Sequence, residues 1–289
     1  MDLAVQRNQV AFIKGRLLCE NVLLASEIVA DFNNPGPVTR GCLQIDLSKA
    51  FDNIDWGFLT NILEDLDLPP MFINWLTECF STPSFSGDSI SAPLFALVMD
   101  TLSKQLDLAT STRRIQAHPL CENPLVTHLS FADDILVFFN GEEASLIAIL
   151  EVLDQFKRVS ELGINLAKSC LFLDGNNFDL INQISSRNNL THGFLPVRYL
   201  GVPLLPSKLT ASDYQPLIDK IKGRISSWTN RHLSFAGRLQ LLHSVINSTI
   251  NFWASIFVLP NKCLADLEQL CSAFLWKGAT SSARGAKVS

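Results

Sequence analysis

Apolar residues recur every three to four positions over several long stretches of this chain, a period that predicts amphipathic helices. One helix is expected to begin after Asp55, a good N-cap residue, and to end before Pro69, because proline cannot continue a helix. The same period runs from Leu94 to Leu106 and again over residues 144–162, where Gly163 is the expected C-cap. We interpret these apolar stripes as the core faces of packed helices.

Shorter apolar runs between these stretches predict strands. Gly41–Ile45 forms one run, while Leu129–Ala132 and Ile135–Phe139 flank a pair of acids in the manner of a hairpin. From about residue 206 onward the pattern becomes helical throughout. A mixed strand–helix region followed by helices alone predicts an α+β fold.

The acids at the hairpin tip, Asp133 and Asp134, are the strongest candidates for chemistry. Adjacent carboxylates repel each other and lose solvation, so a divalent cation is a natural partner for them. An acidic tight turn is the alternative, since Asp favours turns. Asp46 follows directly on the strand Gly41–Ile45 and would supply the third carboxylate of a two-metal site. Asp46 lies 87 residues before Asp133 (133 − 46), so the sequence does not show that they meet. Local pattern taken alone favours Asp46 as an N-cap for the segment that follows.

Composition restricts the class of protein. A hydrophobic fraction of 47% with 18% charged residues is typical of a globular protein. The seven cysteines form no Cys-x-x-Cys pair and the five histidines show no ligand spacing, which disfavours a disulfide framework or a zinc site. No signal-peptide pattern opens the chain, and no apolar run reaches the roughly 18 residues of a membrane span. We therefore expect an intracellular protein of the nucleus or cytoplasm, neither secreted nor bound to a membrane.

Net charge permits nucleic-acid binding without supporting it. The chain carries a formal charge of −5, whereas proteins that grip a nucleic-acid duplex usually present basic surface. Basic residues do concentrate in one region, where they are either a phosphate-contacting face or the solvated side of helices: Lys220, Lys222, Arg224, Arg231 and Arg238.

Two stretches, Asp46–Asp52 and Phe131–Asp134, resemble the first and third palm motifs of reverse transcriptases, in the form found in non-LTR (LINE-type) retrotransposons, especially those of plants. Further stretches match in the same order. Asn8–Arg16 and Asn21–Glu27 resemble the fingers segment, Leu162–Ser169 the fourth palm motif, and Arg198–Leu204 the primer grip.

The resemblance implies a right-hand polymerase palm with partial fingers, followed by an all-helical thumb-like subdomain. Residues 1–40 would be the partial fingers and 41–205 the palm, with an internal deletion near 86–87. Residues 206–277 would be the thumb-like region and 278–289 a flexible tail.

The resemblance also implies roles for individual residues. Asp46 and Asp133 would hold two Mg²⁺ ions with help from Asp134, one ion activating the primer 3′-hydroxyl and the other neutralising the departing pyrophosphate. Lys168 would assist the leaving pyrophosphate, although a surface lysine would look the same in sequence. Phe51 would pack beneath the sugar and exclude ribonucleotides, or be an ordinary buried aromatic. The remaining substrate-binding candidates are Gly87 and Ser91 from the second motif and Tyr199, Leu200 and Gly201 at the primer terminus.

The implied partners are an RNA template, a DNA primer and deoxynucleoside triphosphates. Two departures from the family pattern favour a degenerate, inactive copy. Ser86 stands where the second motif has glutamine, with the preceding hairpin missing, and the chain starts inside the fingers and stops after the thumb-like region. A working RNA-directed DNA polymerase, supported by the complete set of three acids, stays open. A domesticated nucleic-acid- or protein-binding module is the further alternative.

Overall fold

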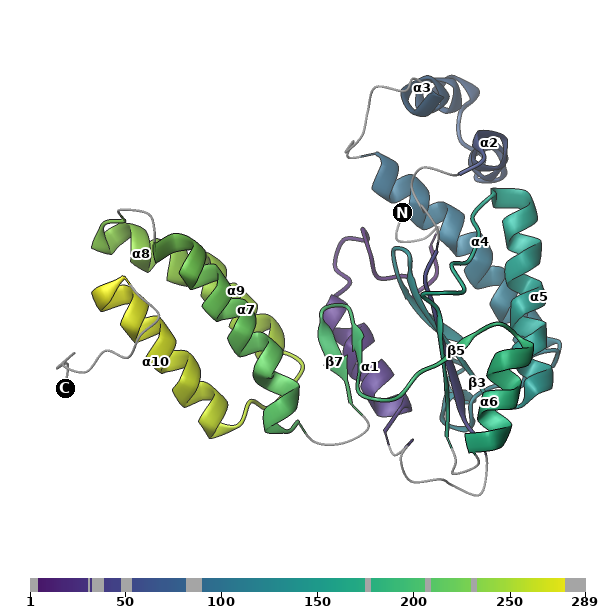
Figure 1. Cartoon of the computed structure of the whole chain (residues 1–289). Coiled ribbons are helices and arrows are strands. Elements are labelled where there is room, and N and C mark those ends of the chain that lie inside the picture. The colour runs from purple at the N-terminus through teal and green to yellow at the C-terminus, as the bar shows by residue number, and fades with distance from the viewer. Residues whose placement is uncertain are drawn as a thin grey trace. The chain divides into compact units, whose positions relative to one another are not determined.

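The computed structural model describes residues 5–30, 32, 39–47, 54–81, 90–174, 178–205, 209–229 and 233–278. The chain divides into two compact units, residues 1–200 and 201–289, each of which is described by itself. The first unit contains helices and strands, and the second is almost entirely helical (Figure 1). The mixed α+β character expected from the sequence is confirmed.

The first unit is built around a five-stranded sheet in the order β2-β3-β1-β4-β5. The strands are β1 (Gly41–Ile45), β2 (His128–Phe131), β3 (Asp134–Phe139), β4 (Cys170–Leu173) and β5 (Thr191–His192). All neighbours in this sheet pair antiparallel except β4 and β5, which are parallel. A separate two-stranded sheet is formed by β6 (Val197–Tyr199) and β7 (Val202–Leu204), and β7 belongs to the second unit.

Helices cover this sheet on both sides. The helices of the first unit are α1 (Leu18–Ile28), α2 (Trp56–Asp65), α3 (Pro70–Ser81), α4 (Ser91–Ser111), the short 3₁₀ helix η1 (Pro119–Cys121), α5 (Glu143–Ser160) and α6 (Phe178–Arg187). Figure 1 shows α4 and α5 running along one side of the sheet and α1 on the other. The central strands β1 and β3 are consequently buried on both faces, which explains their almost continuous apolar sequence.

Gly41 illustrates how tightly β1 and β3 pack. It is the register partner of Phe139, and a Cβ atom at this position would lie only 2.5 Å from the aromatic ring of Phe139. A side chain at position 41 would therefore displace a fully buried phenylalanine.

Most of the predicted elements are confirmed, with two wrong boundaries. Ala132 lies in the hairpin turn and not in the first strand, and Asp134 is the first residue of β3 and not part of the tip, because Phe131 pairs with Asp134. Asp55 caps α2 by accepting a hydrogen bond from the Phe58 amide at 2.6 Å. Gly163 was the expected cap of α5, but Glu161 takes the left-handed conformation there, with φ of 62°. The carbonyl of Ser160 accepts a hydrogen bond from the Asp55 amide at 3.0 Å, the bond that a further helical turn would otherwise make.

The second unit contains α7 (Ala211–Thr229), α8 (Phe235–Leu241), the π-helical turn η2 (Leu242–Ile246), α9 (Asn247–Ala254) and α10 (Asn261–Lys277). The helical stripes predicted beyond residue 206 are thus confirmed as helices, and Ile218 and Ile225 on α7 and Phe274 on α10 are among the buried side chains. Over the described residues, none of the helices is sufficiently long and apolar to span a lipid bilayer.

Buried histidines in the first unit make its stability sensitive to acid. His128 contacts the hydroxyl groups of Thr127 and Ser103 at 2.7 and 2.8 Å. Burial lowers the pKa of His128 to about 4, although Asp107 and Asp100 oppose the shift. Burial, with the charge of Arg40, also lowers the pKa of His118 to about 4. Both side chains are therefore neutral in the folded protein near pH 6.

We expect the free energy of unfolding to fall as the pH drops from about 6.5 towards 4. In the unfolded chain histidine takes up a proton near pH 6.5, whereas in the folded state these two do so only near pH 4. Acid therefore favours the unfolded state, by about 2 kcal/mol per histidine between pH 7 and pH 5. Urea unfolding at the two pH values measures the loss.

His118→Phe provides the critical variant, because it keeps an aromatic ring against Phe32 and removes one titrating group. Its free energy of unfolding should change less between pH 7 and pH 5 than that of the original chain. His243→Gln, at an exposed position of the second unit, should leave the dependence unchanged. An unaltered pH dependence in His118→Phe would contradict the assignment.

Candidate active site

Strand pairing brings the predicted carboxylates to one edge of the sheet. In the antiparallel register of β1 and β3, Ile45 is the partner of Ile135. Asp46 follows Ile45 and Asp134 precedes Ile135, so the two acids occupy the next position of the same ladder. Asp133 belongs to the two-residue turn between β2 and β3. The separation of 87 residues in sequence is thus closed by a single pair of neighbouring strands.

The three carboxylates influence one another electrostatically. All three are half-buried. Burial raises the pKa of Asp134, and the neighbouring charges of Asp133 and Asp46 raise it further. Within the described part of the chain, no three His, Cys, Asp or Glu side chains are grouped so that they could hold a metal ion. The acids therefore make a region of concentrated negative charge that would need further ligands to complete a metal site.

Residues of the segment 162–169 contact both the backbone and the side chain of Asp46. The carbonyl of Asp46 accepts a hydrogen bond from the Asn165 amide at 2.8 Å. The amide of Asp46 donates to the buried hydroxyl of Ser169 at 3.2 Å. Lys168 Nζ lies 3.7 Å from Asp46 Oδ2, with 69% of the lysine side chain exposed. The sequence predicted Lys168 but missed Asn165 and Ser169, whose only signal was their place in the fourth motif.

The turn that carries Asp133 has a strained backbone. Phe131 pairs with Asp134 across the hairpin, which leaves Ala132 and Asp133 as the two loop residues. Ala132 has φ of 55°, the sign expected at the first loop position of a tight β-hairpin. A residue with a Cβ atom in this region costs about 1–2 kcal/mol, so contacts from elsewhere must hold it. The Gln9 side chain supplies one by accepting a hydrogen bond from the Ala132 amide at 3.2 Å.

Tyr199 lies in the interior of the first unit, with only 1% of its surface exposed. Burial raises the pKa of its hydroxyl, and the nearby Asp134 and Cys42 add to the effect while the Asn21 side chain opposes it. No hydrogen bond of good geometry reaches this hydroxyl from the described residues.

The other predicted substrate-binding residues are placed as follows. Leu200 and Gly201 both have positive φ, at 48° and 88°, which is the pattern of a type I′ turn between β6 and β7. Ser91 is exposed at the first position of α4. Phe51 and Gly87 lie outside the described residues.

A cleft of about 490 Å³ lies beside β2, between the N-terminal segment and α1. Its polar lining consists of Arg7, Asn8, Arg16, Glu20 and Asn21. The guanidinium group of Arg16 already donates hydrogen bonds to backbone carbonyls of this segment, so it serves the fold.

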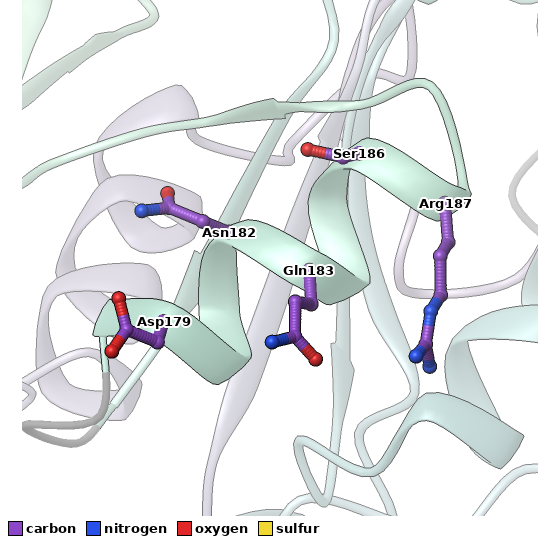
Figure 2. A pocket seen from close by; sticks show the side chains of 5 residues that line it. All are labelled: Asp179, Asn182, Gln183, Ser186 and Arg187. Carbon is purple, nitrogen blue, oxygen red and sulfur yellow. The ribbon is translucent and has the colours of Figure 1, made fainter.

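A second pocket, of about 510 Å³, lies along α6. Figure 2 shows that the side chains lining it all come from this one helix: Asp179, Asn182, Gln183, Ser186 and Arg187. Arg187 is also paired with Glu143 of α5 at 3.4 Å. None of the predicted site residues lines this pocket.

Comparison with known proteins identifies the family. Residues 3–204 match the model of the family described as reverse transcriptase (RNA-dependent DNA polymerase). The match covers more than half of the chain and includes all three carboxylates. The chain therefore belongs to the reverse transcriptase family.

Individual relatives include proteins of transposons. The uncharacterized 149 kDa protein of transposon TX1 from Xenopus laevis is 23% identical over 304 aligned positions, covering 95% of this chain and 22% of the relative. A protein of Arabidopsis thaliana named for ribonuclease H is 34% identical over 80 residues, covering 28% of this chain and 13% of the relative. The chain thus spans less than a quarter of the length of either curated relative.

A solved structure of telomerase from Candida albicans, in complex with a fragment of telomeric RNA, aligns with 94% of this chain and 49% of its own. The TM-score is 0.44 and the sequence identity 10%. Family membership follows from the sequence match over residues 3–204.

Replacing Asp134 by asparagine should stabilise the protein at pH 7. The fold disfavours the ionised form of Asp134, as its raised pKa shows, and asparagine removes the charge with almost no change of shape. We expect the melting temperature to rise by about 2–4 °C, which corresponds to about 1 kcal/mol for a unit of this size.

The advantage of Asp134→Asn should shrink at pH 4, because acid protonates Asp134 in the original chain. Thermal unfolding at both pH values, followed by circular dichroism, measures the difference. Glu122→Gln, at an exposed position of the same unit, is the matched control and should change the melting temperature little. A lower melting temperature for Asp134→Asn at pH 7 would contradict the prediction.

Proposed function

We propose that the chain carries partial fingers at residues 1–40 and, at 41–205, the palm of an RNA-directed DNA polymerase from a non-LTR retrotransposon. This polymerase adds deoxynucleotides to a primer 3′-hydroxyl on an RNA template. The observation that carries this proposal is the meeting of Asp46, Asp133 and Asp134 at one sheet edge, in a chain of the reverse transcriptase family. Concentrated carboxylates on a rigid sheet are suited to phosphoryl transfer, which depends on positioning and on stabilisation of charge.

The donor set fits Mg²⁺. Carboxylate oxygens are the hard ligands that this ion prefers. Burial first, and then the neighbouring charges of Asp133 and Asp46, raise the pKa of Asp134, so a bound cation would favour its ionised form. Mg²⁺ sites in polymerases commonly combine one or two carboxylates with waters and substrate phosphates. When bound, two such ions make the primer hydroxyl more acidic and stabilise the leaving pyrophosphate.

Individual residues would divide the work as follows. Asp46 and Asp133 would be the principal ligands, and Asp134 would assist them. Lys168 is mostly exposed and paired with Asp46 at a long distance, so its ammonium group is free to turn towards the triphosphate of a bound nucleotide. We also propose that the bound nucleotide is contacted by Phe51, Gly87 and Ser91. The primer end would be contacted by Tyr199, Leu200 and Gly201.

The second unit would serve as the thumb. Lys220 and Lys222 are exposed on α7, which would allow them to contact the phosphates of a template–primer duplex. The likeness to a transposon protein and to a plant protein named for ribonuclease H supports a plant retrotransposon as the source. Because both relatives are several times longer, we propose that the chain is one part of a larger element-encoded protein acting in the nucleus or cytoplasm.

Primer extension on an RNA template tests the proposal. With Mg²⁺ present, Asp133→Asn should reduce the extension rate at least about 100-fold, because metal ions supply several kcal/mol of transition-state stabilisation in such sites. Asp179→Asn on α6, outside the carboxylate group, should leave the rate unchanged. Circular dichroism confirms that both variants are folded.

Equal extension by the Asp133→Asn variant and the original chain would refute the proposed site and reveal a contaminating polymerase. Absence of extension by a correctly folded original chain would instead identify the degenerate copy that the departure at Ser86 favours. That residue lies outside the described part of the chain.

A further inference from the structure

The strained turn at Ala132 depends on a contact from the N-terminal segment. Ala132 is 6% exposed and has φ of 55°, and its amide points at the side chain of Gln9. Gln9 Oε1 accepts this hydrogen bond at 3.2 Å and a second one from the Ala11 amide at 3.0 Å. Both partners are N–H donors, so the side-chain atom that faces them must be the oxygen.

The backbone around Gln9 is fixed to the same hairpin. Gln9 forms a parallel bridge with Ser130, in which the Ser130 amide donates to the Asn8 carbonyl at 2.9 Å and the Val10 amide to the Ser130 carbonyl at 3.1 Å. Asn21 Nδ2 donates a second bond to the Ser130 carbonyl at 3.1 Å. The N-terminal segment therefore pairs with β2 over a short distance. This pairing fixes the position of Gln9 along β2, next to the Ala132–Asp133 turn.

An apolar residue would satisfy the packing at position 9 more simply. Gln9 is completely buried, and its Nε2 group finds no hydrogen-bond partner among the described residues. A buried amide with an unpaired donor is unfavourable, so the oxygen must provide something that the fold requires. What it provides is the acceptor for Ala132 and Ala11.

We propose that Gln9 is a positioning residue that holds the Ala132–Asp133 turn, and through it the carboxylates of Asp133 and Asp134, in the arrangement needed to bind metal ions. The proposal rests on the proposed function for the meaning of those carboxylates. Asp133 follows Ala132 directly, so rotation of the Ala132 backbone moves the Asp133 side chain. Misplacement of a reacting group by about 1 Å lowers rates about 100-fold.

The chain offers a matched control in Gln6, which lies on the same segment. Its Oε1 is buried but accepts no hydrogen bond from the described residues. The Gln6 backbone makes the bonds to the side chains of Asp100 and Arg16. Gln6→Met and Gln9→Met thus make the same chemical change at neighbouring places, and only Gln9→Met removes an acceptor from the turn.

Three measurements on the full chain test the proposal. Amide hydrogen exchange at Ala132 should be at least about tenfold faster in Gln9→Met, because the donor has lost its partner. Mn²⁺ binding, followed by electron paramagnetic resonance, should weaken about tenfold, the usual effect of losing a group that orients metal ligands. In primer extension kcat should fall about tenfold or more while the affinity for a DNA–RNA duplex stays unchanged. Gln6→Met should match the original chain in all three.

Gln9→Glu keeps two acceptor oxygens, so it should restore the protection of Ala132 that Gln9→Met loses. If Gln9→Met does not fold, Gln9→Asn, whose shorter side chain cannot reach both amides, replaces it with the same expectations. Unchanged exchange at Ala132, or Mn²⁺ affinity equal to that of the original chain, would overturn the proposal. So would equal losses in Gln6→Met.

The exchange and Mn²⁺ measurements need no polymerase activity. A chain that fails to extend a primer but shows both effects would refute the polymerase function and retain the positioning role. A chain that extends primers but shows neither effect would retain the polymerase and refute the role of Gln9.

Discussion

The antiparallel pairing of β1 with β3 is the constraint on which the candidate site depends. Both strands are buried on both faces, so their side chains fix the register: Gly41 must face Phe139, and Ile45 must face Ile135. A slip of one residue would exchange the two faces of a strand and place Phe139 against a different partner. The same register brings Asp46, the residue that follows β1, beside Asp134, the first residue of β3. The packing of the core and the meeting of the carboxylates are therefore one arrangement.

The candidate site lowers the stability of the fold, and hydrogen bonds from neighbouring segments hold it in place. Asp134 is half-buried among like charges, and Ala132 adopts a backbone conformation that suits glycine better. Such local conflicts are characteristic of functional sites and persist only where surrounding contacts fix them. Here the contacts come from two distant segments, with Ser169 holding the backbone of Asp46 and Gln9 holding the turn. Residues from two further family motifs thus form hydrogen bonds to the segments that carry the acids.

Much of the candidate site could be predicted from sequence because its residues sit at the ends of strongly patterned elements. The acids at 133 and 134 interrupt two apolar runs, and Asp46 closes a third, so their positions at strand ends follow from local pattern. Gln9, Asn21 and Ser169 could not be predicted in this way. Each is an ordinary polar residue whose role is a hydrogen bond to a segment more than 100 positions away in sequence.

The sequence by itself determined the α+β class, the hairpin, the helical second unit and membership of the reverse transcriptase family, because periodicity and short motifs are local properties. It misplaced the end of α5, where a bond from the Asp55 amide to the Ser160 carbonyl overrides the glycine signal at Gly163. Only the tertiary structure decided that Asp46 lies beside Asp134. It alone also decided that the buried side chain of Gln9 supports the Ala132–Asp133 turn. Those facts depend on strand register and on long-range hydrogen bonds, which local pattern does not specify.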